Sequence, residues 1–292
     1  MQPVFRKIVI FGVGLIGGSF ALALKAAGAV DHVVGVGRRA ATLERARALG
    51  IIDATGALEA ATLSDADLVL VSVPVAQTKA VLGELSPHLG AATLVTDAGS
   101  TKQDVVAAAR VAMGARIARF VPGHPIAGTE HSGPDAAFAE LYRGRNVVLT
   151  PLAENSPADV ARVRAAWEAC GARVRELGAA DHDEVLASVS HLPHLLAYAL
   201  VEHVAGRAGG EEPMSYAAGG FRDFTRIASS HPEMWRDICL ANRGALLREL
   251  AGYGKVLDQV RDMLERGDGT ALQTLFDKAR LARNRWLERS GG

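Results

Sequence analysis

Three glycines near the N-terminus, Gly12, Gly14 and Gly17, directly follow an apolar run at residues 7–11. A strand, then G-x-G-x-x-G, then a helical pattern is the order in which Rossmann folds bind dinucleotides. Gly12 would allow the tight turn, Gly14 would let the backbone approach a pyrophosphate, and Gly17 would let the following helix pack on the strand. The alternative is a glycine-rich turn with a packing role alone. We predict a dinucleotide site, with further contacts from Leu15, Ile16, Val73 and Pro74.

Two arginines, Arg38 and Arg39, stand at the end of the second predicted strand, where NAD-binding folds carry an acidic residue for the ribose 2′-hydroxyl. Guanidinium groups bind phosphate through paired hydrogen bonds, so these arginines favour the 2′-phosphate of NADP. NADP is therefore the favoured cofactor, with NAD as the second choice. The alternative interpretation is that both arginines begin a solvated helix.

His124 is the candidate base. It lies in P-G-H-P-I-A-G-T-E, residues 122–130, which we expect to form a loop at the carboxyl edge of a parallel sheet. A neutral imidazole there could accept a hydroxyl proton while hydride leaves the same carbon. Ser100, which follows another predicted strand, offers a hydroxyl at the same edge. Its alternative role is the N-cap of the next helix, and the two roles are compatible.

The C-terminal part of the chain carries two further groups of polar residues. S-H-L-P-H at residues 190–194 places two histidines three positions apart, with His182 upstream. No third ligand at standard spacing accompanies them, so no metal is predicted. Arg222 and Arg226 lie four positions apart beside Asp223, an arrangement that suits a carboxylate site and a solvated ion-pair face equally well.

The elements that must position these residues fall into two parts. Short β-branched runs alternate with alanine-rich helical stretches through residue 178, a pattern that predicts a parallel sheet covered by helices. Strands are predicted at residues 7–11, 32–36, 68–73, 93–96, 119–121, 146–149 and 173–176, and helices at 18–27, 41–49, 102–113 and 158–169. From residue 179 the strand signals stop, and helices are predicted at 182–204, 232–264 and 270–289.

We therefore predict an α/β protein with two domains. A Rossmann-like, doubly wound parallel sheet should occupy residues 1–178, and an all-α substrate and dimerisation domain residues 179–292. The apolar content of the helical part is high for so small a bundle. This predicts that part of its surface is buried against a second copy of the chain, giving a homodimer.

The amino-acid composition limits the classes of partner and the cellular compartment that we expect for the protein. Lys plus Arg and Asp plus Glu both total 32 among 292 residues, which argues against nucleic acid and membrane surfaces as partners and favours a small-molecule substrate. Cys170 and Cys239 do not suggest a disulfide framework, so a reducing cytoplasm is expected. The uncharged run at residues 8–24 superficially resembles a signal peptide, but its glycines fit a strand and turn better. No other stretch is expected to be long and apolar enough to cross a bilayer.

Three motifs follow the glycine fingerprint in order: H-P-I-A-G-T-E, S-H-L-P-H and G-F-R-D-F-T-R-I-A. With them, the chain from Ile8 to about Trp235 resembles the prephenate/arogenate (cyclohexadienyl) dehydrogenase family of tyrosine biosynthesis. The resemblance implies a Rossmann-like domain, a helical dimerisation domain and an active site between them. It also implies oxidative decarboxylation, in which hydride passes to NAD(P)+, carbon dioxide leaves and the ring becomes aromatic.

The resemblance also implies roles for residues at matching positions. His124 would accept the hydrogen bond of the ring hydroxyl, and Ser100 would position both groups. Arg226 would bind the side-chain carboxylate, and the other implied pocket residues are Thr129, Glu130, His182, Ser190, His194, Asp223 and Trp235. The choice between prephenate and arogenate could depend on Asn146, His131 or Glu130, and the uncharged Asn146 favours prephenate, whose side chain has no amine.

Two other functions stay open on the sequence alone. One is an NADP-linked β-hydroxyacid or imine reductase with a similar Rossmann-plus-helical plan. Such enzymes usually depend on a helical lysine or a different acid, whereas the chemistry here depends on His124. The other is a non-catalytic NADP sensor that uses its helical part as an interaction surface.

Overall fold

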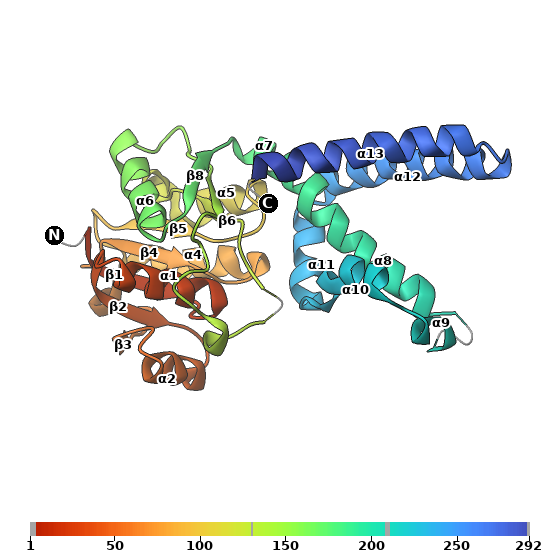
Figure 1. Ribbon diagram of the computed structural model, residues 1–292. Coiled ribbons are helices and arrows are strands. Elements are labelled where there is room, and N and C mark those ends of the chain that lie inside the picture. Colours follow the sequence, from red (N-terminus) through yellow and green to blue (C-terminus); the bar gives the residue numbers. More distant parts are fainter. Residues whose placement is uncertain (1–3, 130, 208–210, 291–292) are drawn as a thin grey trace. The chain divides into compact units, whose positions relative to one another are not determined.

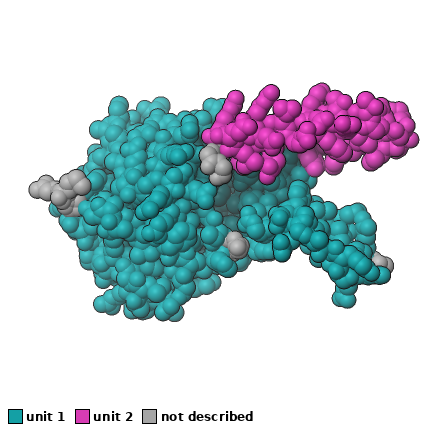
Figure 2. Space-filling view, viewed as in Figure 1, with its two compact units in different colours: residues 1–243 teal, residues 244–292 magenta. Residues whose placement is uncertain are grey.

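The structure is a computed structural model that describes residues 4–129, 131–207 and 211–290 (Figure 1). The chain forms two compact units, Met1–Arg243 and Gly244–Gly292, which Figure 2 shows in different colours. The last strand ends at Glu176, near the predicted domain boundary. The first compact unit nevertheless also contains the helices up to residue 241. All described residues of the candidate site lie in the first unit.

A five-stranded parallel sheet with the order β3-β2-β1-β4-β5 forms the centre of the first unit. Its strands are β1 Phe5–Phe11, β2 Val30–Val36, β3 Ala54–Thr55, β4 Leu68–Val71 and β5 Leu94–Asp97. Apolar runs fill β1 and β4 because helices cover both faces of the sheet. The chain order reverses between β1 and β4, and open α/β sheets bind ligands beyond the carboxyl ends of the strands at such a point.

Helices pack on both faces of this sheet: α1 Leu15–Ala26, α2 Ala40–Ala48, α3 Ala60–Leu63, α4 Thr78–Leu85, α5 Gln103–Met113 and α6 Pro157–Ala169. Residues of α1, α2 and α6 belong to the apolar cluster on one face, and those of α3, α4 and α5 to the cluster on the other. α6 begins at Pro157, one residue before the predicted start, and Ser156 caps it because its Oγ accepts the Asp159 backbone N–H at 3.1 Å. α3 and α4 were missed because segments of four and eight residues carry little periodic signal.

A second sheet, with the order β6-β7-β8, holds His124. Its strands are β6 Gly123–Pro125, β7 Asn146–Leu149 and β8 Arg173–Glu176, with β6 antiparallel and β8 parallel to β7. The prediction of a loop is therefore wrong at His124, which pairs with Val148. A three-residue strand that contains a proline gives no alternating pattern to read.

The predicted strand at residues 119–121 is also wrong. These residues follow a 3₁₀ helix, Gly114–Arg119, and make an isolated bridge between Phe120 and Val95. The apolar character that suggested a strand comes from burial, since Phe120 and Val121 are both fully buried.

The described residues after Glu176 form helices, namely α7 Ala179–Leu186, α8 Leu192–Ala205, α9 Glu211–Ser215, α10 Gly219–Thr225, α11 Pro232–Ala241, α12 Arg243–Glu265 and α13 Gly269–Ser290. The predicted helix 182–204 contains a π-helical turn, Ala187–His191, that joins α7 to α8 without a break in the helix. The predicted helix 232–264 is interrupted at Asn242. π-turns occur often at functional sites, because they redirect side chains along a helix.

The continuous helical run Ala179–Ala205 has the length and composition of a membrane-crossing helix, with a mean hydropathy of 1.3 in its most apolar window. The expectation that no such stretch exists is therefore wrong on that measure. The run contains His182 and Asp183, whose side chains are buried in the first unit and hydrogen-bonded there. Buried polar groups with protein partners are typical of a helix inside a folded domain.

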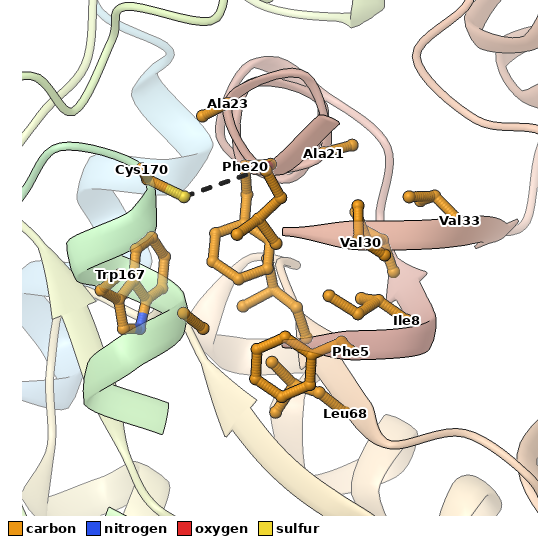
Figure 3. Close-up of a cluster of buried hydrophobic side chains, with 14 of the residues drawn as sticks. Phe5, Ile8, Phe20, Ala21, Ala23, Val30, Val33, Leu68, Trp167 and Cys170 are labelled. Atoms are coloured by element: carbon orange, nitrogen blue, oxygen red, sulfur yellow. Dashed lines mark hydrogen bonds between the residues drawn. The ribbon is translucent and has the colours of Figure 1, made fainter. Parts of the chain in front are cut away.

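The apolar core beside the glycine loop is built on aromatic packing between α1 and α6 (Figure 3). Phe20 of α1 contacts Trp167 of α6, with ring centroids 4.6 Å apart. Tyr142 packs edge-on against Trp167 at 5.3 Å, and its hydroxyl donates to the Ile16 carbonyl oxygen at 2.6 Å. These contacts fix the start of α1 relative to the sheet.

Truncating this packing should destabilise the first unit. Because Trp167 is fully buried, Trp167→Ala should lower the free energy of unfolding by about 3–5 kcal/mol. Urea unfolding followed by circular dichroism measures the change. Val111→Ala, at a position of α5 that is 73% exposed, is the control and should change stability by less than about 0.5 kcal/mol. Equal stability of the two variants would contradict this account of the core.

Candidate active site

The glycine loop between β1 and α1 has the geometry that a dinucleotide requires. Gly12 has φ +95°, and a Cβ there would lie 2.2 Å from the Ser72 carbonyl oxygen. A Cβ on Gly17 would lie 2.4 Å from the Gly12 carbonyl oxygen. At Gly14, by contrast, no heavy atom of the described residues other than Gly14 and its chain neighbours lies within 4 Å of a Cβ position. The loop is thus closed toward the protein and open at Gly14, directly before the N-terminus of α1, where a pyrophosphate fits.

The other predicted cofactor residues surround this loop. Leu15 is buried and Ile16 half-buried in the first turn of α1. Val73 and Pro74 follow β4, and a Cβ on Gly12 would lie 3.2 Å from Val73 Cγ1. Arg38 and Arg39 are exposed between β2 and α2, and Arg39 is the N-cap residue of α2. Both arginines are therefore outside the apolar core.

His124 is buried on β6, and its Nδ1 lies 2.9 Å from Nε2 of His182. Burial holds the pKa of His124 well below 6.5, and electrostatic repulsion of a protonated His124 ring by the protonatable neighbours His182, Lys102 and His191 acts in the same direction. The ring is therefore neutral at physiological pH and can accept a proton.

His182 and Asp183 occupy neighbouring positions on α7, and His182 contacts Asp183 through the ring nitrogen that does not face His124. His182 Nδ1 lies 2.8 Å from Asp183 Oδ1. The Asp183 carboxylate also accepts the backbone N–H groups of Lys102 and Gln103, at 2.8 and 2.9 Å. These hydrogen bonds help hold the pKa of Asp183 below its ordinary value against the opposing effect of burial. Both ring nitrogens of His182 are thus engaged within the protein, which leaves neither for a substrate.

A buried ion pair holds the strand that carries His124. Lys102 Nζ contacts Asp97 Oδ2, and both side chains are almost completely buried. Lys102 Nζ also donates to the Gly123 carbonyl oxygen at 2.8 Å, and Asp97 Oδ1 accepts the Gly123 N–H at 3.0 Å. Both backbone groups of the residue before His124 are therefore fixed by one ion pair.

His191, His194 and Trp235 form an aromatic group at the π-turn and α11. His194 stacks on Trp235 with ring centroids 3.5 Å apart, and His191 lies edge-on to Trp235 at 6.2 Å. His191 Nδ1 pairs with Asn242 Nδ2 at 3.1 Å, and burial lowers the pKa of His191 to about 4. Within the described residues, His191 Nε2 and Trp235 Nε1 are buried without hydrogen-bond partners. Such atoms are available to a bound polar molecule.

Several predicted residues lie toward the surface. Ser100 and Ser190 are half-buried, and the Ser190 carbonyl oxygen bonds His194 Nδ1 at 2.9 Å. Burial lowers the pKa of His194, and the charge of Arg226 adds to this effect. Arg226 and Asp223 are both exposed.

The remaining predicted contacts are not joined to the buried group by the hydrogen bonds that the structure describes. Thr129 is exposed, and its Oγ1 accepts the His131 backbone N–H at 3.2 Å. Asn146 is exposed at the start of β7, where its Oδ1 accepts from Arg175 Nε at 3.4 Å. Glu130 lies outside the described residues.

Sequence reasoning missed Asp97, Lys102, Asp183 and Asn242. Lys102 and Asp183 resemble ordinary charged residues at helix starts, and nothing local distinguishes them from solvated ones. The available signal was that Asp97 and Lys102 flank Ser100 in the segment already selected, and that Asp183 is adjacent to His182. Within the described residues, no group of three or more histidines, cysteines or carboxylates is arranged to hold a metal ion.

The arrangement is suited to removing a proton from a hydroxyl beside a nicotinamide. One compact unit provides an open dinucleotide loop and a buried neutral histidine. It also provides two buried ring nitrogens, His191 Nε2 and Trp235 Nε1, that have no hydrogen-bond partner among the described residues.

Comparisons with known proteins agree with this chemistry. Residues 20–176 match the family model described as prephenate dehydrogenase, nucleotide-binding domain, and residues 178–278 the model described as prephenate dehydrogenase, dimerization domain. A cyclohexadienyl dehydrogenase of Zymomonas mobilis is 39% identical over 285 residues, covering 97% of this chain and 96% of the relative. A prephenate dehydrogenase of Bacillus subtilis is 36% identical, covering 96% of this chain and 76% of the relative.

Solved structures give the same result. The crystal structure of prephenate dehydrogenase from A. aeolicus in complex with hydroxyphenyl propionate and NAD+ has a TM-score of 0.89 and 35% identity, covering 96% of this chain and 98% of that chain. The Synechocystis arogenate dehydrogenase has a TM-score of 0.81 and 31% identity, covering 96% and 100%. The predicted fold class and family resemblance are confirmed: the chain belongs to the prephenate dehydrogenase family.

Proposed function

We propose that the protein catalyses the oxidative decarboxylation of prephenate, arogenate or both, with hydride transfer to NAD(P)+. The observation that carries the proposal is His124: a buried, neutral imidazole in the same compact unit as an open dinucleotide loop. Relatives at 34–39% identity that are named cyclohexadienyl or prephenate dehydrogenase support it. Neither the reductase nor the sensor alternative gains support from these relatives.

In the proposed reaction His124 handles the proton of the ring hydroxyl. The bound nicotinamide supplies the acceptor for the hydride that leaves the hydroxyl-bearing carbon. The bond to the ring carboxylate breaks, its electron pair enters the ring, and carbon dioxide leaves. His124 accepts the hydroxyl proton as carbonyl character develops and returns it to the phenolate oxygen, so no net proton is released. Aromatisation supplies most of the driving force, and the protein chiefly orients the reactants.

The substrate's side-chain carboxylate would bind at the edge of the aromatic group. Arg226 is exposed, and its charge contributes to lowering the pKa of His194, which stacks on Trp235. A guanidinium provides the paired donors that a carboxylate needs. His191 Nε2 and Trp235 Nε1, which lack partners among the described residues, are further polar atoms that the substrate could satisfy.

The chain would work as a homodimer in the cytoplasm. Large apolar side chains are exposed along α12 and α13, namely Leu247, Leu250, Val256, Leu257, Leu264, Phe276, Leu281 and Trp286. Residues 178–278 match a family model described as a dimerization domain, and these side chains are suited to an interface between two copies. Both cysteines, Cys170 and Cys239, are free, as suits a reducing compartment.

The direct test is a two-by-two assay of prephenate or arogenate with NAD+ or NADP+, followed by absorbance of the reduced nicotinamide. Turnover is expected, with NADP+ preferred because Arg38 and Arg39 are free to pair with its 2′-phosphate. Arg38→Ala/Arg39→Ala should raise the Kd for NADP+ by roughly 10- to 100-fold and leave that for NAD+ nearly unchanged. Arg47→Ala, at the far end of α2, is the control. No turnover of either substrate by protein that binds NADP+ would refute the proposed function.

Loss of the proposed base should slow the reaction itself. His124→Asn should lower kcat by roughly 100- to 10,000-fold with little change in KM, whereas His203→Asn, at an exposed position of α8, should have no effect. Since the neutral ring is the active form, wild-type kcat/KM should be constant near neutral pH. It should fall only as the pH drops through the His124 pKa, well below 6.5. Unchanged turnover in the His124 variant would remove this residue from the role.

Arg226 should act on binding more than on the chemical step. Arg226→Ala should raise KM by roughly 10- to 100-fold, the effect expected when a charged hydrogen-bond partner is removed. Arg222→Ala, which removes an exposed guanidinium four residues earlier, is the matched control and should leave KM unchanged. Initial rates over a range of substrate concentrations separate the two parameters. A fall in kcat at constant KM would contradict the assignment.

A further inference from the structure

A single line of hydrogen bonds connects the proposed base to the start of α5. It runs from His124 Nδ1 to His182 Nε2 at 2.9 Å, from His182 Nδ1 to Asp183 Oδ1 at 2.8 Å, and from the Asp183 carboxylate to two backbone N–H groups. The two imidazoles lie 58 positions apart in sequence. The His124, His182 and Asp183 side chains that form this line are all buried. The proposed reaction assigns a task only to the first member.

The direction of these hydrogen bonds follows from the carboxylate at their inner end. An ionised carboxylate can only accept, so His182 Nδ1 must carry a proton. In a neutral His182, Nε2 is then an acceptor, and His124 Nδ1 must donate to it. A neutral His124 that is protonated on Nδ1 has its lone pair on Nε2. The line thus selects the one tautomer of His124 whose outer nitrogen can take a proton.

Asp183 is built to stay ionised and fixed in this position. Its two backbone donors, from Lys102 and Gln103, lie at the N-terminus of α5, where N–H groups have no carbonyl partner within the helix. The helix dipole favours a negative charge at this end. Its own carbonyl oxygen accepts from Asn242 Nδ2 at 2.7 Å. The charged or titratable groups around the line are Lys102 directly before α5, Asp104 in the first turn of α5 and His191 in the π-turn.

We propose that His182 and Asp183 are positioning residues that hold His124 in the Nδ1-protonated tautomer, leaving Nε2 to accept the substrate's hydroxyl proton. This inference rests on the proposed function for the identity of the substrate. The tautomer itself is a property of the free protein. It also replaces the predicted role of His182 as a substrate contact.

The first test reads the tautomer without any substrate. In protein labelled with 15N-histidine, long-range proton–nitrogen correlation spectra distinguish the two tautomers, and His124→Asn identifies the His124 signals among those of the nine histidines. At pH 7.5 we expect His124 to be protonated on Nδ1 alone. Protonation on Nε2, or an average of both nitrogens, overturns the inference. Because no turnover is measured, this result is independent of whether the proposed function is correct.

The second test reverses the line. Asp183 Oδ1 accepts from both His182 Nδ1 and the Lys102 N–H, whereas Oδ2 accepts from the Gln103 N–H. In Asp183→Asn, an amide that keeps its oxygen on the Gln103 N–H therefore turns its NH2 toward His182 Nδ1 and gives up the Lys102 hydrogen bond. His182 would then donate from Nε2, and His124 would present an N–H at its outer nitrogen. We expect kcat to fall roughly 10³- to 10⁴-fold at every pH, as when a catalytic histidine is held in the wrong tautomer, with unchanged KM. Asp181→Asn, at an exposed position of α7, is the control. A merely structural role would raise KM or lower the affinity for NADP+ instead, and that outcome overturns the inference.

A pair of variants at His182 covers the case in which Asp183→Asn fails to fold. Gln in His182→Gln offers an oxygen that can accept from His124 Nδ1, whereas Leu in His182→Leu offers no acceptor. Neither change touches the hydrogen bonds between Asp183 and α5. The Gln variant should have a kcat roughly tenfold above that of the Leu variant, with equal affinity for NADP+. Equal turnover of the two variants would show that the acceptor at this position does not matter.

Discussion

The buried pairing of Lys102 with Asp97 is the interaction on which the geometry of the site depends. A lysine ammonium is stable in the interior only with a partner charge and further hydrogen bonds, and removing one partner of such a pair strongly destabilises a protein. Asp97 ends β5, Lys102 precedes α5, and together they bind the N–H and carbonyl groups of Gly123. The ion pair thus couples the main sheet to β6. Any movement of β6 that displaced His124 would expose or separate two buried charges.

The same turn serves the helical part of the site. The backbone N–H of Lys102 donates to Asp183, while its side chain holds Gly123. One residue therefore contacts both the strand that carries His124 and the helix that carries its hydrogen-bond partner. This double attachment explains how two imidazoles from different elements are kept at hydrogen-bonding distance. All residues of this arrangement belong to the first compact unit.

The sequence predicted the elements that depend on local patterns and missed the contacts that join residues far apart in the chain. β1, the glycine loop and α1 follow from an apolar run, a fixed spacing and a helical period, and all three are observed. His124 and His182 were both found from motifs, but their contact joins elements 58 residues apart, and Asp183 meets Lys102 over 81 residues. A charged residue at a helix start is usually solvated, so no local pattern shows that Lys102 and Asp183 are buried. The strand at His124 was missed because it has three residues, one of them a proline.

The distribution of charge suits a reaction in which one carboxylate must bind and another must leave. A free cation beside His124 would bind the departing carboxylate in the ground state, and binding of that kind raises the barrier to its loss. Lys102 is close enough to influence His124 but is neutralised by Asp97, so its charge is not offered to the substrate. Arg226, which is exposed, is the cation that we propose binds the carboxylate that remains. Burying and pairing the inner charges thus separates proton transfer from anion binding, which lets the same molecule be held at one end and lose carbon dioxide at the other.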